Sequence, residues 1–409
     1  MVNAADPPVD VLVVGCGAAG LSAAIALGRA GFSVVAIGTL DTVSNGRTVA
    51  LFEGSLRFLR AQRLWPRLAD LAAKIEAIEM IDASGARVPI PRILLSAEDV
   101  GLSALGANIE TDRLVGRLAE IAREIPGLRL ETEMLADISQ ADNHLRATFA
   151  SGRNIGAKLI AGADGSRSTV RAKARIGTRR WTYPQVAMTA LIAHEKPHAN
   201  RSVEFHTRSG PCTLVPLVPR DGARNRSSLV WLMSTREAAA RRGLAPDALG
   251  GEIEREVEGI FGNLRLDSAC GFFPMMGMSV TRLAARRIAL LGEAAHAFPP
   301  LAAQGLNLSL RDIGALVECL AEARARGADI GLALRPYAQA RRPDIALRTS
   351  GIDALNRSLL SDFLPIEVAR GLGSLAFATI GPLRRALILE GILPHEHRPV
   401  HNPRPVRVQ

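Results

Sequence analysis

Residues 11–20 read Val11-Leu-Val-Val-Gly15-Cys-Gly17-Ala18-Ala19-Gly20, and this stretch decides the fold. An apolar run precedes the first glycine, and residues 21–29 are rich in Ala and Leu with helical spacing, which predicts a strand at 9–14, a turn and a helix. In such a unit Gly15 permits the tight turn, Gly17 lets the backbone approach a pyrophosphate and Gly20 allows close packing of helix on strand. A chance glycine-rich turn is the weaker interpretation, because a strand and a helix flank the motif.

The second predicted strand, Phe32 to Ile37, ends without the acidic residue that usually follows it. A carboxylate that hydrogen-bonds a ribose is expected about 20 residues beyond the glycines, but the chain has Gly38 there. Either Asp41 reaches back to the ribose, or backbone and water contacts replace the carboxylate. The missing acid weakens the interpretation as a simple NAD-dependent dehydrogenase.

Composition indicates a globular protein. The chain has 409 residues, of which 48% are hydrophobic, enough for a substantial core and two domains or lobes. The net charge of +10 comes from scattered arginines and aromatic residues make up only 4%, whereas a nucleic-acid surface clusters its basic residues. We therefore expect no nucleic-acid partner. A solvated arginine-rich surface is the simplest interpretation, with attraction to anionic substrates, NAD(P)H or an anionic membrane as alternatives.

Cysteine spacing and hydropathy indicate in which cellular compartment the protein is expected. The four cysteines are far apart and form no CxxC pair, which favours a reducing compartment without disulfides. The N-terminal residues lack the pattern of a secretory signal, and no apolar run reaches the roughly 18 residues of a membrane span. We expect a cytoplasmic protein, soluble or peripheral on the inner face of the cell membrane.

Two further segments place polar residues where a predicted strand ends. Asp164-Gly165 follows an apolar run at 159–163, and Gly292-Glu293 follows one at 288–291. A carboxylate at such a position accepts hydrogen bonds from ribose or ribityl hydroxyls, although Asp164-Gly165 alone is more typical of an ordinary turn with a helix cap. Gln304-Gly305-Leu306-Asn307 opens a long predicted helix, whose N–H groups can hold a polarised ring carbonyl.

No catalytic side chain and no set of metal ligands emerges from the sequence. His296 is more typical of a packed, hydrogen-bonded histidine than of a catalyst, so it receives no acid–base role.

The three segments resemble the GxGxxG, DG and GD fingerprints of the FAD-dependent aromatic monooxygenases, and the resemblance covers nearly the whole chain. Glu293 stands where that family has Asp, and Ala303 replaces a common Gly. Residues 45–51 resemble the segment whose arginine contacts the flavin. The resemblance implies FAD contacts at Gly15, Gly17, Ala18, Ala19, Gly20, Asp41, Arg47, Thr48, Arg113, Asp164, Gly165, Gly292, Glu293, Gln304, Gly305, Leu306 and Asn307.

Within that family the chain is most similar to the ubiquinone-biosynthesis hydroxylases. This resemblance rests on residues 47–55, on 209–217 with 228–231, and on 353–359. It implies a polyprenylated phenol as substrate, O2 and NAD(P)H as cosubstrates, and association with a ubiquinone-biosynthesis complex. O2 does not react with a phenol at useful rates, so a reduced flavin must first form a C4a-hydroperoxide that transfers oxygen to the ring. Residues 359–393, apolar and arginine-bearing, are either a membrane-contacting face or two ordinary packed helices.

We predict an α/β (α+β) fold in which a Rossmann-like FAD-binding domain carries an inserted, mainly antiparallel β-sheet substrate domain and C-terminal helices. Helices are expected at 56–72, interrupted at Trp65-Pro66, and at 112–125, with a hairpin at 78–90. The FAD-binding domain is expected to consist of three segments, 1–75, 96–180 and 276–345. The other expected segments are 76–95 (β-hairpin of the substrate domain), 181–275 (substrate-domain sheet), 346–394 (C-terminal helices) and 395–409 (disordered tail).

Other flavoprotein classes fit less well. A disulfide reductase needs a cysteine pair, and a flavin halogenase a tryptophan-rich motif; neither is present. A flavoprotein reductase of isoprenoid substrates and a non-catalytic FAD-binding subunit of a biosynthetic complex stay open as alternatives.

Overall fold

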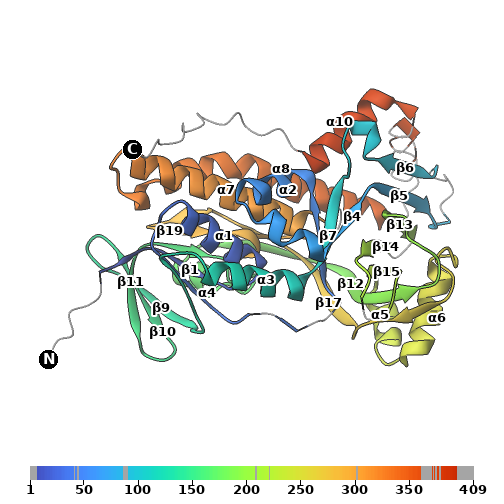
Figure 1. Cartoon of the computed structure of the whole chain (residues 1–409), viewed down its shortest axis with the longest axis horizontal. Helices are drawn as coiled ribbons and strands as arrows, with labels where there is room; N and C mark the ends of the chain where they lie inside the picture. Colours follow the sequence, from blue (N-terminus) through green and yellow to red (C-terminus); the bar gives the residue numbers. More distant parts are fainter. Residues whose placement is uncertain are drawn as a thin grey trace.

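The computed structural model describes residues 7–40, 42–43, 46–85, 91–207, 210–220, 222–300, 303–360, 371, 373, 375–376 and 379–393, with the backbone alone at Leu332 and Leu359. The molecule is elongated, with a β-sheet towards each end and the helices α7 and α8 running along it (Figure 1).

The first sheet has eight strands and contains the nucleotide-binding motif. Its five parallel strands follow the order β19-β11-β1-β2-β8. Their bounds are Ile288–Leu290 (β19), Asn154–Gly162 (β11), Val9–Val14 (β1), Val34–Ile37 (β2) and Leu128–Glu131 (β8). The short strand β18 (Ala284–Ala285) and the hairpin of β9 (Leu135–Gln140) and β10 (Leu145–Phe149) extend it with antiparallel pairs. Because parallel strands share one carboxyl edge, the turns after β1, β11 and β19 lie close together.

Three helices pack together over this sheet. Helix α1 (Ala18–Arg29) contacts both α3 (Thr111–Arg123) and α7 (Gln304–Ala325). The apolar residues of α3 repeat at helical spacing and are buried, as the sequence predicts for residues 112–125. A short helix, α4 (Thr169–Lys173), follows β11.

The second sheet has nine strands in the order β20-β17-β12-β15-β14-β13-β5-β6, with β16 pairing β12. The pair β5–β13 is parallel and the other pairs are antiparallel. One face is buried under α5 (Thr235–Arg241) and α6 (Pro246–Glu256). The strand bounds are Ala77–Asp82 (β5), Ile93–Ser96 (β6), Thr178–His194 (β12), Arg201–Thr207 (β13), Gly210–Leu217 (β14), Arg226–Ser234 (β15), Leu264–Leu266 (β16), Gly271–Val280 (β17) and His296–Ala297 (β20).

A small three-stranded sheet joins the two large ones. It consists of β3 (Thr48–Phe52), β7 (Gly106–Glu110) and β4 (Ala72–Ile75), and α2 (Glu53–Ala61) follows β3 directly. Glu110 at the end of β7 is buried and pairs with the buried guanidinium of Arg226 on β15 at 2.9 Å. Asp267 holds the same guanidinium at 2.6 Å. This cluster fixes the small sheet to the nine-stranded one.

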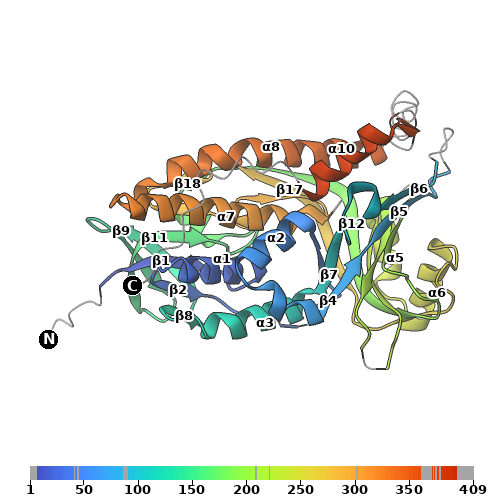
Figure 2. The same ribbon diagram turned by 45° about the horizontal axis from the view of Figure 1, so that its top comes forward.

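The C-terminal region is helical. Helix α8 (Leu334–Leu359) packs along α7, and α10 (Gly381–Ile392) places Ile388 and Ile392 in one apolar cluster with residues of β5 and β6 (Figure 2). Short 3-10 turns lie at 65–67, 69–71, 98–100, 292–294 and 330–332. Within the described residues, no helix is both long enough and apolar enough to cross a membrane.

The structure confirms the predicted fold class and corrects several elements. The helix predicted at 56–72 ends at Ala61, before the interruption predicted at Trp65-Pro66. The helical continuation after Pro66 is wrong, because residues 65–67 and 69–71 form short 3-10 turns and Ala72 begins the strand β4, which pairs with β7. The hairpin predicted at 78–90 has a longer connection than expected, since its second strand is β6 at 93–96, which pairs with β5. Residues 86–90 lie outside the described residues.

Other elements were missed or cannot be compared. Strands β3 and β9 and helices α5 and α6 were not predicted, although Ser234 and Glu237 form a capping box at the start of α5 that the sequence displays. The boundaries predicted at 181 and 275 fall inside the strands β12 and β17, and the division into segments stays a prediction. The tail at 395–409 lies outside the described residues.

Candidate functional site

The three glycine-containing turns meet at the carboxyl edge of the parallel sheet. Gly15 has a φ of +115°, and a Cβ there would lie 2.2 Å from the carbonyl oxygen of Ala163, directly before Asp164. A Cβ on Gly292 would lie 3.6 Å from Cβ of Ala19. Segments far apart in the sequence therefore form one continuous site.

The start of α1 is arranged to receive a phosphate. Gly17 is extended, with φ −77° and ψ −178°, and a Cβ built on it meets nothing within 4 Å. No side chain of the described residues caps this helix, so the N–H groups of its first turn, at Ala18 to Gly20, point out of the helix without intrahelical acceptors. Such a helix start is an anion site, and the open space at Gly17 is where a pyrophosphate would approach.

One carboxylate oxygen of Asp164 accepts a hydrogen bond within the protein, and the other has no donor among the described residues. Its Oδ2 accepts a hydrogen bond from the backbone N–H of Val170 at 3.0 Å. Its Oδ1 is buried, and nothing in the described portion of the chain hydrogen-bonds to it. A buried acceptor without a donor costs free energy, so this oxygen fits a hydroxyl supplied by a ligand. Gly165 beside it has a φ of +77° and open space around it.

The turn at Gly292-Glu293 is hydrogen-bonded to a buried aspartate, Asp312. This residue was not singled out in the sequence analysis. Asp312 on α7 accepts hydrogen bonds from the Gly292 N–H at 3.4 Å, from His296 Nε2 at 2.7 Å and from Arg341 Nε at 2.9 Å. Burial alone would raise the pKa of Asp312, but His296 and Arg341 outweigh it and hold the pKa below its ordinary value. The sequence signal that could have identified Asp312 is an aspartate that lies among the buried, apolar positions of a helix. His296 is packed and hydrogen-bonded, as predicted from the sequence, and its lack of an acid–base role stays a prediction.

Glu293 takes no part in this buried network. Its side chain is exposed, and no hydrogen bond or ion pair joins it to another residue in the described ranges. The carboxylate therefore stays available to ligand hydroxyls, and its flavin contact remains a prediction.

The segment at Arg47 lies on the nine-stranded sheet. The Arg47 guanidinium stands over the ring of Phe273, 5.8 Å from its centroid. Thr48 Oγ1 donates to Ser228 Oγ at 2.9 Å, so its side chain joins two sheets. Arg113, half-buried in the first turn of α3, has no contact with the three turns among the interactions of the described residues, and its predicted role is the least supported.

The start of α7 is tied into the protein. Asn307 accepts from the Phe52 N–H at 2.9 Å and from Ser55 Oγ at 2.6 Å, and it donates to the carbonyls of Ala50 and Ala303. Its side chain is fully used, so a cofactor contact there must come from the backbone. Gln304 is buried, whereas Gly305 is exposed with open space around it and Leu306 is half-buried.

The structure explains why glycine, and not the expected ribose-binding acidic residue, stands at position 38. Gly38 has a φ of +146°, and a Cβ there would lie 2.9 Å from the backbone nitrogen of Cys16 inside the phosphate turn. A larger residue would therefore strain the turn in this conformation. Asp41, the predicted substitute, lies outside the described residues.

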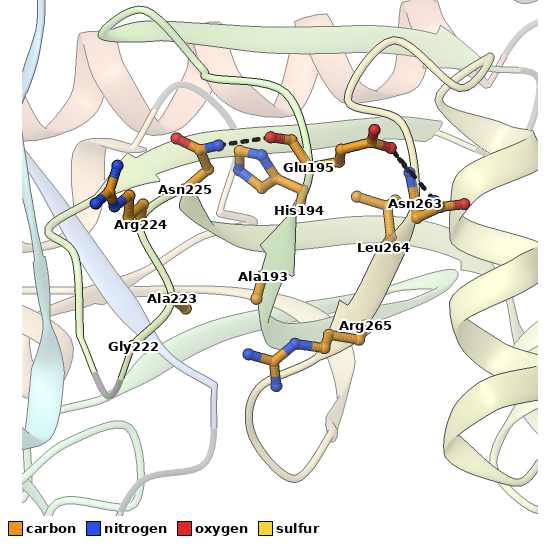
Figure 3. Close-up of a pocket in the computed structure, with 10 residues that line it drawn as sticks. All are labelled: Ala193, His194, Glu195, Gly222, Ala223, Arg224, Asn225, Asn263, Leu264 and Arg265. Carbon is orange, nitrogen blue, oxygen red and sulfur yellow. Dashed lines mark hydrogen bonds between the residues drawn. The ribbon is translucent and has the colours of Figure 1, made fainter.

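A separate open cleft of about 490 Å³ lies at the end of β12, against the loops before β15 and β16 (Figure 3). Asn225 and Asn263 both donate hydrogen bonds to Glu195 there. None of the predicted site residues lines this cleft, which is distinct from the site at the parallel sheet.

The residues at the carboxyl edge fit FAD. The open helix start suits its pyrophosphate, and the buried Oδ1 of Asp164 suits one of its hydroxyls.

Comparison with known proteins agrees with this geometry. A family model described as "FAD binding domain" matches residues 8–347. Ubiquinone hydroxylase UbiL of Rhodospirillum rubrum is 32% identical over 395 residues, covering 94% of this chain and 90% of that protein. The 3-demethoxyubiquinol 3-hydroxylase of Escherichia coli is 27% identical, covering 92% and 97%.

A solved structure extends the likeness to the fold. The p-nitrophenol 4-monooxygenase PnpA of Pseudomonas putida superposes with a TM-score of 0.78 at 20% identity, covering 94% of this chain and 97% of that one.

Proposed function

The chain belongs to the FAD binding domain family, and we propose that it is a FAD-dependent monooxygenase that hydroxylates the aromatic ring of a polyprenylated phenol in ubiquinone biosynthesis, using O2 and NAD(P)H. The substrate class follows from relatives named as ubiquinone hydroxylases, to which the chain is similar along nearly its whole length.

One observation carries the proposal. The glycine turn, the half-unpartnered Asp164 and the Gly292 turn come together at one edge of a parallel sheet, beside a second sheet large enough to form a substrate wall. The flavin, when bound, supplies the activation of O2. Residues 15–20 bind its pyrophosphate, Asp164 accepts a hydroxyl, and the segments at Arg47 and Ala303 orient its ring and exclude water.

The test is made on the purified full-length protein. We expect a yellow protein that consumes NAD(P)H and O2 faster when a prenylated phenol is added, with a product heavier by one oxygen atom. Flavin binding without substrate-stimulated oxidation would support the non-catalytic subunit instead. Reduction of the prenyl chain without O2 uptake would support the reductase.

We also infer that the protein docks on an anionic lipid surface through the outer face of α10, defined as Leu383 and Leu387 of the helix together with Ile380, which directly precedes it. These residues follow helical spacing and are 49%, 39% and 51% exposed, whereas Ile388 and Ile392 on the inner face are buried. Arg385 beside them is exposed, and Arg384 pairs with Asp99 at 3.3 Å. Apolar residues flanked by arginines match an anionic bilayer, where a polyprenylated substrate would reside.

Vesicle binding tests this face. The protein should sediment with phosphatidylglycerol vesicles, and the double variant Leu383→Ser/Leu387→Ser should bind about tenfold more weakly, because the exposed parts of two leucine side chains no longer enter the apolar layer of the bilayer. The control Met134→Ser removes an exposed apolar side chain from the other end of the molecule and should bind like the wild type. Equal binding of all three proteins would refute lipid docking through this face and leave it available to a partner protein of a biosynthetic complex.

A further inference from the structure

A carboxylate and a histidine lie side by side on the face of the nine-stranded sheet opposite α5 and α6. His206 Nε2 lies 2.7 Å from Glu204 Oε1, and Thr213 Oγ1 donates to Glu204 Oε2 at 3.4 Å. None of these residues was singled out in the sequence, and none takes part in the cofactor site described above.

Strand register shows which way Glu204 faces. Glu204 pairs with Thr213, Thr213 with Val230 and Val230 with Thr189, which makes one row across four strands. Side chains alternate between the two faces of a sheet. The neighbouring residues on the same strands, Val203, Phe205, Cys212, Leu214, Leu229 and Trp231, are buried in the cluster under α6.

The row itself is not packed in the same way. Thr189 is buried and Val230 packs against the cluster of Tyr183 and Ile352, whereas Glu204 and Thr213 are half-buried although they lie on inner strands of the sheet. The Glu204 side chain is 24% exposed, so the described residues leave part of its carboxylate uncovered. A ligand can reach the carboxylate from this face of the sheet.

Both segments assigned to the flavin ring border this row. On one side, Thr48 bonds to Ser228, two residues along β15 from Val230, and a Cβ on Gly46 would lie 2.7 Å from Cα of Ala190. On the other side, Met80 pairs with Glu204 and belongs to the same apolar cluster as Ala303. Glu204 thus lies between the Arg47 segment and the loop that begins α7.

The charge of Glu204 decides what it can do. Burial by itself raises the pKa of Glu204, but the hydrogen bond from His206 outweighs this and leaves the pKa below its ordinary value. The group is ionised at neutral pH and accepts hydrogen bonds. It does not take the proton of a phenol in the ground state, because the pKa of a phenol is about 10, several units higher.

We propose that the Glu204 carboxylate accepts a hydrogen bond from the phenolic hydroxyl of the substrate and thereby orients its aromatic ring towards the flavin. This inference rests on the proposed function. A hydrogen bond to a charged acceptor is directional, and it increases the electron density of the ring, which favours attack by an electrophilic oxygen. His206 and Thr213 hold the carboxylate in place.

The experiment compares a short-chain prenylphenol with its methyl ether, which lacks the hydroxyl proton. Binding to the oxidised holoprotein is measured by the change in the flavin absorbance spectrum, and turnover by product formed per NAD(P)H consumed. The variants are Glu204→Gln and the matched control Glu256→Gln, a half-buried carboxylate on α6 over the opposite face of the sheet.

The wild type and the control should bind the phenol about tenfold more tightly than the ether, the size of one charged hydrogen bond. Glu204→Gln should keep its flavin, lose this preference, and form about tenfold less product per NAD(P)H. Phenol-stimulated turnover with an unchanged preference in Glu204→Gln would overturn the role of Glu204 and leave the hydroxylase intact. A hydroxyl preference that depends on Glu204, without stimulated turnover, would overturn only the hydroxylase. Binding of neither compound would overturn both.

Discussion

Two glycines of one motif have different physical roles. At Gly15 the backbone is left-handed and a Cβ would overlap the Ala163 carbonyl, so glycine is needed for folding. At Gly17 the backbone is extended and the space beyond is open, so glycine is needed only if a ligand fills that space. The two positions therefore separate fold from cofactor binding.

We predict that Gly17→Val leaves the free energy of unfolding of the flavin-free protein unchanged within about 0.5 kcal/mol, as for a substitution that removes no contact. It should reduce the flavin content at least about tenfold, because the side chain occupies the pyrophosphate approach. Flavin absorbance per protein and urea denaturation measure the two effects. Gly15→Ala should instead destabilise the flavin-free protein, and wild-type flavin content in Gly17→Val would refute the assigned site.

At the scale of elements, Asp312 joins α7, α8 and the turn after β19. Its carboxylate is fully buried and is shared by Gly292, His296 and Arg341, while Arg341 also bonds to Asp344 at 2.7 Å. Asp344 in turn accepts from Arg348, whose guanidinium bonds to Glu390 on α10. One chain of charges thus connects the third fingerprint to the C-terminal helix.

This network makes a contribution to stability that depends on pH. The pKa of Asp312 is lowered in the folded state, so its contribution is complete above its ordinary value of 3.8 and is lost as the pH falls through the folded-state pKa. Asp312→Asn should lower the free energy of unfolding by about 3–5 kcal/mol at neutral pH, since His296 and Arg341 then lose the buried carboxylate to which they are hydrogen-bonded.

Urea denaturation across a pH series measures the effect. The difference between wild type and Asp312→Asn should shrink below about pH 4. As a control, Asp70→Asn removes an exposed partner of Arg117 and should cost less than about 1 kcal/mol. A gap that stays constant in acid would contradict the assignment of the lowered pKa to Asp312.

At the scale of the whole molecule, the Arg226 cluster sets the position of the small sheet on the nine-stranded one. Arg226 is 2% exposed and bonds to Glu110, Asp267 and the Val218 carbonyl. Because β3 of the small sheet begins directly after Arg47, this cluster also fixes the segment proposed to contact the flavin relative to the nine-stranded sheet.

We predict that Arg226→Met lowers the free energy of unfolding by about 3–5 kcal/mol, because the buried carboxylate of Glu110 and the half-buried carboxylate of Asp267 lose their common partner. The control is Arg220→Met, since Arg220 pairs with the same Glu110 at 3.2 Å but its side chain is 43% exposed. That change should cost less than about 1 kcal/mol. Urea denaturation of the FAD-saturated variants measures the free energy of unfolding of each. Equal losses in Arg226→Met and Arg220→Met would show that the burial of Arg226 is not the source of the stability.

Much of the nucleotide-binding half was predictable because its signals are local. The strand, the turn and the helix around Gly15 to Gly20 each follow from neighbouring residues, and so do the strands that precede Asp164 and Gly292. Local patterns failed after Pro66, where two short 3-10 turns and then the strand β4, which pairs with β7 from Ala72 on, replaced the expected helix. There the partner strand lies far along the chain, and no short-range pattern reports it.

The sequence by itself determined the fold class, the phosphate turn and the family, because these depend on residue type and spacing within short segments. Only the tertiary structure decided that Asp312 supports the Gly292 turn, that Gly38 packs against the Gly15–Gly20 turn and that Glu204 lies on the face of the nine-stranded sheet away from α5 and α6. Each of these depends on which side chains of distant segments meet, and on which face of a sheet a residue lies. Strand register and packing settle those contacts, and neither can be read from one segment alone.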